Sequence, residues 1–409
     1  MIASRTTRAV AHSLRLLVVL TVAGSDALAA DAIFDPYVEV GGIYNDNYFL
    51  ARSGTRLQEA NGGYVDAGVD LRLESPRTQW RIEPRVRSTA YSSNSDLDST
   101  DYYLTGALNH RGERARGNVL VSLVDEDIVE GNLPDASFDG PILGQGGATD
   151  SGRVLGANRR QYLTASPSAA FELSQRLQLT AAAEFLDMSF DREIAGAQVS
   201  YRTLGGLLGL GRKFSEASEV TLGVGYSQFD PDVGGRGSDL QTLRLQWDYR
   251  TTERLRTYFR AGTIRTKFDA VGATRARSES GSLFGVGGQW AFLKSDLFVD
   301  LQQFVEANGS GFVVERSNLR LQYNHRFTPR VTGFAAVYGI RDQAVGVSRS
   351  VYAPRRYVNA NIGVEWRVRR TLSLLGRIEH AQQEFSGDAR SADGNAVRLA
   401  VVYRPRRLD

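Results

Sequence analysis

Arginines and carboxylates that alternate with apolar residues are the side chains of this sequence best suited to bind another molecule. In one segment, Arg81, Glu83, Arg85 and Arg87 recur at every second position. Such groups hold anions and polar solutes through charge-assisted hydrogen bonds. The residues expected to line a polar path in this way are Arg81, Glu83, Arg85, Arg87, Arg244, Gln246, Asp248, Arg250, Arg320, Gln322, Asn324, Arg326, Asn359, Asn361, Glu365, Arg367, Arg377 and Glu379.

The same residues have a plainer interpretation. Opposite charges on neighbouring strands can pair with one another and stiffen a wall. A path that attracts anionic groups, such as uronates or phosphates, needs arginines that face water without a partner. The segments 81–87 and 320–326 are the best candidates for such arginines. The sequence leaves both interpretations open.

Motifs of catalysis and metal binding are absent from the sequence. It has no Cys, and His12, His110, His325 and His380 show no ligand spacing. There is no G-x-S-x-G elbow, no P-loop and no H-E-x-x-H. We therefore expect no enzyme, no cofactor and no metal site, with a barrel-embedded hydrolase as a minor alternative because carboxylates are plentiful. No aromatic-basic platform indicates nucleic-acid binding.

Strands position these side chains, because apolar and polar residues alternate with a period of two. In the segment 357–369, Val358 and Ile362 share one face, whereas Asn359 and Asn361 share the other. Eight short turns and nine longer polar loops separate such segments, which are about twice the length of strands in soluble proteins. The pattern predicts an all-β, transmembrane antiparallel up-and-down β-barrel of 18 strands, with 16 as the alternative.

The four tryptophans are placed alike. Trp80, Trp247, Trp290 and Trp366 lie within a few residues of a short turn and on the apolar face. Tryptophan prefers the boundary between hydrocarbon and water, and an ordinary core would not gather its rings at one end of the strands. The pattern predicts a periplasmic aromatic girdle.

The longest loop spans residues 128–158 and is rich in Gly, Pro and Asp. Loops of this length are usually functional or disordered. We expect a constriction loop folded into the lumen, with an exposed loop holding a weak cation site as the alternative. The acidic residues of this region are Asp125, Glu126, Asp127, Glu130, Asp135 and Asp139.

The N-terminus has the pattern of a secretory signal peptide. Basic residues precede a short apolar run at 16–23, and a small-x-small site follows at 27–29. These 29 residues hold three Arg against one Asp, so the net charge is +3 with them and +1 without them. A charge of +1 gives no general attraction to nucleic acid. The expected organisation is a signal peptide at 1–29, a short lead at 30–36, the outer-membrane barrel at 37–404 and a tail at 405–409.

The segment 37–49 resembles the opening of a family of outer-membrane β-barrel porins, whose first strand ends in a Tyr-x-Asp-Asn-x-Phe signature. Its places are occupied by Tyr44, Asp46, Asn47 and Phe49. Several members are encoded with exopolysaccharide synthesis and export machinery, so the resemblance implies a conduit for a secreted polysaccharide. The chain departs from barrels that end on an aromatic residue, because six residues follow Tyr403.

Three functions fit these expectations. The leading hypothesis is an outer-membrane conduit that exports an anionic or neutral exopolysaccharide, together with periplasmic export components. The first alternative is a general or solute-selective diffusion porin. The second is a structural or adhesive barrel whose loops bind partners. In each case we expect a monomer, surrounded by lipid of the Gram-negative outer membrane.

Overall fold

The computed structural model describes residues 31–51, 57–129, 156–194, 197–232, 236–270, 275–346, 352–386 and 391–405. The expected signal peptide and residues 406–409 of the expected tail lie outside these ranges. Among the described residues, no helix is long and apolar enough to cross a membrane.

The described residues form 18 strands and one short 3-10 helix. The strands are β1 (Asp31–Asn45), β2 (Ala60–Glu74), β3 (Thr78–Tyr91), β4 (Ser99–Arg111), β5 (Ala115–Asp127), β6 (Arg159–Glu172), β7 (Leu177–Phe190), β8 (Tyr201–Lys213), β9 (Ser218–Pro231), β10 (Ser238–Thr252), β11 (Leu255–Phe268), β12 (Arg277–Ala291), β13 (Ser295–Ala307), β14 (Val313–Thr328), β15 (Val331–Ala344), β16 (Arg355–Arg369), β17 (Leu372–Phe385) and β18 (Ala392–Tyr403). The 3-10 helix is η2 (Ser95–Leu97).

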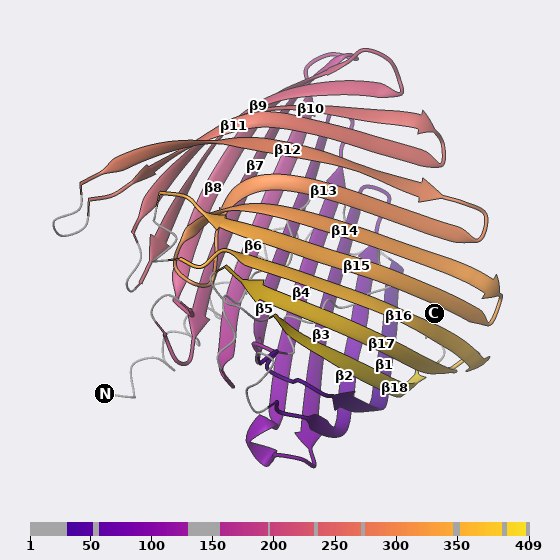
Figure 1. The fold of residues 1–409 in the computed structure, drawn as a ribbon. Helices are drawn as coiled ribbons and strands as arrows, with labels where there is room; N and C mark the ends of the chain where they lie inside the picture. The colour runs from indigo at the N-terminus through magenta and orange to yellow at the C-terminus, as the bar shows by residue number, and fades with distance from the viewer. Residues whose placement is uncertain are drawn as a thin grey trace.

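The sheet closes on itself (Figure 1). Each strand pairs antiparallel with its neighbours in the chain, and β1 also pairs with β18. Connections alternate between short turns and loops, and both Asp31 and Tyr403 lie at the short-turn end. The predicted 18-stranded up-and-down barrel is confirmed, and the alternative of 16 strands is wrong. Closure removes the sheet edges that would otherwise expose unpaired backbone groups.

Strand β1 begins earlier than the sequence pattern indicates. It starts at Asp31, so residues 31–36 of the expected lead at 30–36 belong to the barrel, where they pair with β2 like the rest of β1. Aspartate and proline are depleted in strands, so the alternation of apolar and polar residues did not indicate a strand in this segment. Proline is tolerated there because β1 pairs with β18 only from Val38 onward, and one side of Pro36 is therefore a free edge.

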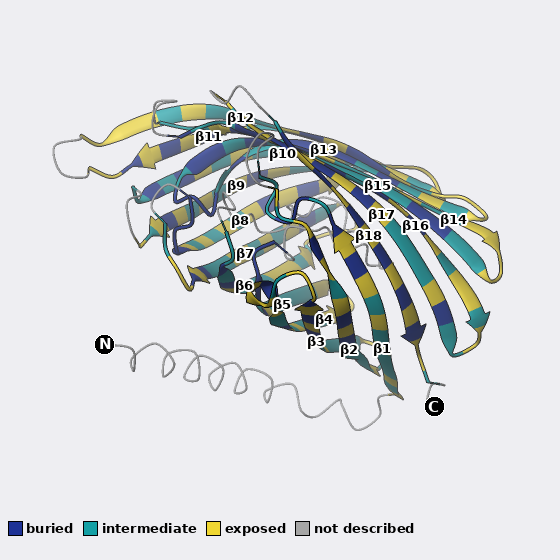
Figure 2. Cartoon of the chain, turned by 60° about the horizontal axis from the view of Figure 1, so that its bottom comes forward, coloured by how far each residue is buried: buried dark blue, intermediate teal, exposed yellow. Residues whose placement is uncertain are grey.

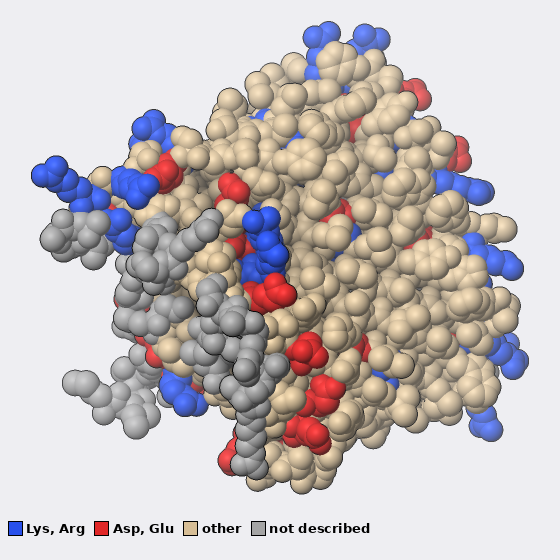
Figure 3. Space-filling model, viewed as in Figure 1, with Lys and Arg blue, Asp and Glu red and all other residues tan. Residues whose placement is uncertain are grey.

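The barrel is apolar outside and polar inside. In β16, Val358 and Ile362 are exposed, whereas Asn359 and Asn361 are buried. The alternation appears as stripes of exposed and buried residues along the strands in Figure 2. Figure 3 shows a broad uncharged surface over β13–β18, with Lys and Arg at the short-turn end. A soluble sheet protein has the opposite arrangement, so this outer surface faces lipid.

An arginine in the middle of the apolar face is expected to destabilise the barrel strongly. Ile362 lies at the centre of β16 and is 60% exposed. Ile362→Arg should cost about 2–4 kcal/mol of folding free energy in a bilayer, because the charge lies in hydrocarbon. Urea titration of the barrel refolded into phospholipid vesicles measures this cost. Ile362→Leu is the control, and equal stability of the two variants would contradict the lipid-facing assignment.

Candidate functional site

The inner faces of β2 and β3 carry a compact network of arginines and carboxylates. The Asp66 side chain is only 3% exposed. It accepts a hydrogen bond of 2.9 Å from Nε of Arg85 and another of 2.9 Å from Nε of Arg87. The hydroxyl of Tyr37 donates to the same carboxylate at 3.0 Å. Two guanidinium groups and a phenol thus converge on one buried carboxylate.

A second carboxylate continues this network toward the short turns. Asp70 accepts from Nε of Arg72 at 2.9 Å and from Nε of Arg81 at 3.1 Å. Arg81 also forms an ion pair with Glu83. The segment 81–87, expected to offer arginines without partners, is therefore tied into ion pairs. For these residues the interpretation as a stiffened wall is the better one.

Strands β16 and β17 hold another polar cluster of predicted residues. Glu379 is buried, accepts a hydrogen bond from Nδ2 of Asn359 and lies 3.3 Å from the guanidinium of Arg377. Asn361 is buried beside Asn359, and its Oδ1 has no hydrogen-bond partner in the described part of the chain. Buried acceptors of this kind usually bind water.

The wall from β10 to β14 is paired less completely. Gln246 donates to both carboxylate oxygens of Asp248, at 2.9 and 3.0 Å, and accepts from Arg260 at 3.0 Å. Arg320 lies over the ring of Tyr338 at 5.9 Å. The other predicted residues lie on the inner face in the short-turn half of their strands: Arg250, Gln322, Asn324, Arg326, Glu365 and Arg367.

Two loops meet across the mouth of the barrel at its loop end. The β7–β8 and β13–β14 loops are separated along the wall by the four strands β9 to β12. From β8 to β13 the wall therefore measures about 24 Å. Nevertheless, the Val199 N–H donates to the carbonyl of Gly309 at 2.8 Å. The Ser310 hydroxyl donates to the carbonyl of Ala197 at 3.3 Å. At least one of the loops must leave the wall and cross the mouth.

The β13–β14 hairpin is the segment that leaves the wall. Pairing of β13 with β12 ends at Gln303, whereas its pairing with β14 continues to Ala307. Asn308, in the connecting loop, is buried and donates to the hydroxyl of Tyr352 at 3.0 Å. Tyr352 belongs to the β15–β16 loop. The hairpin tip is therefore held by the loops on both sides of it.

A buried ion pair supports the base of this hairpin. Arg316 of β14 donates from Nε and from Nη2 to the two carboxylate oxygens of Asp342 on β15, each at 2.6 Å. Arg316 also pairs with Glu306 on β13. Two-point contacts between guanidinium and carboxylate are geometrically specific. They hold β14 against β15 at the level where β13 has already separated from β12.

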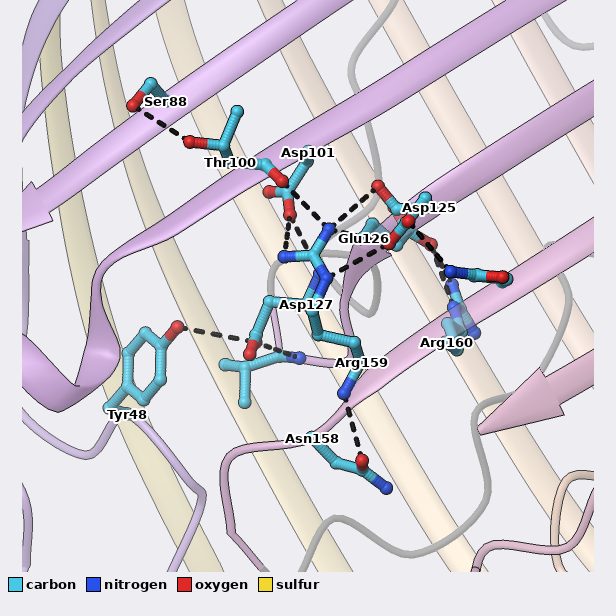
Figure 4. Close-up of polar contacts among 12 residues, drawn as sticks. Tyr48, Ser88, Thr100, Asp101, Asp125, Glu126, Asp127, Asn158, Arg159 and Arg160 are labelled. Atoms are coloured by element: carbon cyan, nitrogen blue, oxygen red, sulfur yellow. Dashed lines mark hydrogen bonds and ion pairs between the residues drawn. The ribbon is translucent and has the colours of Figure 1, made fainter. Parts of the chain in front are cut away.

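The predicted constriction loop is described only at its base. Glu126 accepts from Arg160 at 2.6 Å, and Asp125 from Arg159 at 2.7 Å (Figure 4). Asp127 accepts from the Val129 N–H at 2.8 Å. The three carboxylates therefore anchor the start of the loop to β6 and to its own backbone. Three further predicted residues lie outside the described ranges: Glu130, Asp135 and Asp139.

The motif residues after β1 fasten the seam of the barrel. Asp46 accepts from the backbone N–H of Asn395 at 2.7 Å and from its side chain at 2.8 Å. Asn47 donates to the carbonyl of Asp393 at 2.7 Å. These contacts join the end of β1 to the start of β18. Phe49 packs on the apolar cluster inside the loop end, whereas Tyr44 is exposed on the outer face.

The fold and the lumen together define a transmembrane β-barrel of the bacterial outer membrane with the architecture of a porin. This is the fold that the resemblance of the first strand implies. Among the described residues, no cluster of His, Asp or Glu is arranged to hold a metal ion. No protein-family model matches the chain, and no curated protein matches it.

Several solved outer-membrane structures are similar to this chain in architecture. Pseudomonas aeruginosa OccK2 (OpdF), in complex with glucuronate, has a TM-score of 0.46 at 13% identity, over 92% of this chain and 99% of that chain. P. aeruginosa OpdQ has a TM-score of 0.47 at 9% identity, over 93% and 98%. Acinetobacter baumannii OccAB1 has a TM-score of 0.44 at 12% identity, over 94% and 100%. The assignment of the barrel rests on the strand pairing and burial of this chain itself.

Proposed function

We propose that the protein is a diffusion porin for small polar solutes, with an outer mouth narrowed by loops that fold across it. The observation that carries this proposal is the contact between Val199 and Gly309, made from opposite sides of four intervening strands. The inner wall is polar along its length and supplies exchangeable hydrogen bonds to a passing solute. The loops limit how large that solute can be.

Export of a polysaccharide, the leading hypothesis from the sequence, has less support. A polymer chain in transit occupies the mouth continuously, so the loop contacts of Val199 and Asn308 would have to open throughout export. A small solute can pass beside these contacts. The adhesive alternative needs loops that extend outward, whereas the described parts of the β7–β8 and β13–β14 loops are buried against each other. Partners from an export machinery are not needed for the porin.

The proposal assigns roles to two sets of predicted residues. The inner residues from Arg81 to Glu379 border the solute path, some as partners in ion pairs and some in contact with solute. The aromatic residues near the short turns form the periplasmic girdle, and Trp247 and Trp366 are well exposed there. The reaction chemistry of an enzyme has no part in this function.

Liposome swelling tests the proposal. Vesicles that contain the purified barrel are diluted into isosmotic solutions of neutral sugars of increasing size. We expect rapid swelling with monosaccharides and slow swelling with tetrasaccharides. Absence of swelling with every sugar would contradict the porin, and a deletion strain that loses its surface polysaccharide would then favour export.

A further inference from the structure

Arg244 differs from the arginines of the β2–β3 wall in having no counter-ion. It lies on the inner face near the middle of β10. Among the described residues, none forms a hydrogen bond or an ion pair with it. The charges that act on it are those of Arg260, which repels it, and Asp248, which attracts it. Arg244 therefore presents its positive charge to the lumen without a carboxylate bound directly to its guanidinium group.

The neighbouring polar groups are already engaged with one another. The Asp248 carboxylate is bound by the amide of Gln246, whose carbonyl oxygen in turn accepts from Arg260. Two guanidinium groups thus share one carboxylate that is hydrogen-bonded elsewhere. An anion between Arg244 and Arg260 would reduce their mutual repulsion. Guanidinium groups suit oxyanions, because their paired N–H groups match the oxygens of a carboxylate or a phosphate.

Glycines stand across from Arg244 on both neighbouring strands, and the Arg244 side chain packs over the one on β9. A Cβ added at Gly223, directly across from Arg244 on β9, would lie 3.4 Å from Cγ of Arg244. Gly262 is the residue directly across on β11. The inner positions of β8 and β9 also include glycines, so this part of the wall carries few side chains: Gly205, Gly209, Gly211 and Gly225.

Arg320 is a weaker candidate for the same role. It packs against Tyr338 and stands directly across from Asp300 in the β13–β14 register. A carboxylate is therefore close to its charge, whereas glycines stand on both sides of Arg244. The register of the strands distinguishes the two arginines.

We propose that Arg244 selects the solutes of the channel and that they are small oxyanions, carboxylates or phosphates. This inference rests on the proposed diffusion function. The arginines of the β2–β3 wall, by contrast, are bound directly to carboxylates. A carboxylate or phosphate that crosses the lumen meets Arg244 midway along β10.

Ion selectivity in planar bilayers tests this role. Reversal potentials are measured under gradients of potassium chloride, potassium acetate and potassium phosphate. The measurement is made on the wild type and on a barrel whose residues 308–312 are replaced by a two-residue turn. We expect a preference for anions, which Arg244→Gln lowers roughly threefold, as one unit charge at about 7 Å in water predicts. Arg244→Lys should retain the preference, and Arg244→Glu should reverse it.

Arg265→Gln is the matched control. Arg265 lies on the neighbouring strand β11 but on the outer face, where it donates to Ser278 at 2.9 Å. This variant should leave the reversal potential unchanged. A conducting barrel whose selectivity is the same in Arg244→Gln and the wild type overturns the role of Arg244 and leaves the porin intact. A barrel that conducts in neither background overturns the porin and this inference with it.

Discussion

Shortening the β13–β14 hairpin is expected to raise the single-channel conductance severalfold. The variant replaces residues 308–312 by Asn-Gly, a turn that closes two strands in register. Ala307 and Val313 are already paired, so the strands themselves are retained. The change removes the contacts of Asn308 with the β15–β16 loop and of Ser310 with the β7–β8 loop, so the hairpin tip no longer crosses the mouth. Conductance in planar bilayers measures the effect.

The matched control makes the same replacement at the other end of β14. Residues 329 and 330 form the short turn to β15, far from the outer mouth. Asn-Gly at that turn should leave the conductance at the wild-type value. If the shortened hairpin and the control conduct alike, the hairpin does not narrow the path. Limited proteolysis should cleave both variants no more than the wild type, which would show that the barrel itself is retained.

The architecture could be predicted from the sequence because its determinants are local. Alternation in β16 places Ile362 outward and Asn361 inward, and the facing follows from neighbouring residues alone. Short turns that recur between long alternating segments set the number of strands. The start of β1 was missed because Asp31 and Pro36 are poor strand residues that only pairing with β2 retains.

Whether each arginine forms an ion pair could not be predicted, because the pairing depends on the register between strands. Arg87 stands directly across from Asp66 on β2, and the two form an ion pair. Arg244 stands across from Gly223 and Gly262, so the same residue type lacks a counter-ion there. The sequence shows an inward arginine in both cases. Only the pairing of strands separates a structural arginine from one that can bind solute.

The inward path of the β13–β14 hairpin could not be predicted from the sequence pattern either. The loop at 308–312 is short and consists of small polar residues with one Phe, which is typical of an ordinary outer loop. Its burial arises from contacts with Val199 and Tyr352, which are distant in the chain. The sequence pattern instead indicated the longest loop, 128–158, as the constriction. The described part of that loop anchors its own base.

Asp66→Asn is expected to lower the stability of the barrel by about 3 kcal/mol. The carboxylate is the shared acceptor of Arg85, Arg87 and Tyr37. The neutral amide removes the negative charge that the two guanidinium groups share and offers them one acceptor oxygen in place of two. The loss is large because Asp66 is buried and its partners cannot all turn toward water.

Thermal unfolding in detergent, followed by the shift in gel mobility of the heated barrel, measures this loss against a matched variant. Asp187→Asn removes the same kind of carboxylate from a pair with Arg202, whose side chain is 58% exposed. Exposed pairs contribute roughly 0–1 kcal/mol, so this variant should unfold close to the wild-type temperature. If Asp66→Asn is equally mild, water in the lumen compensates the arginines, and the β2–β3 network would have to be assigned to the solute path. Its arginines would then share the role proposed for Arg244, and selectivity would be spread around the wall.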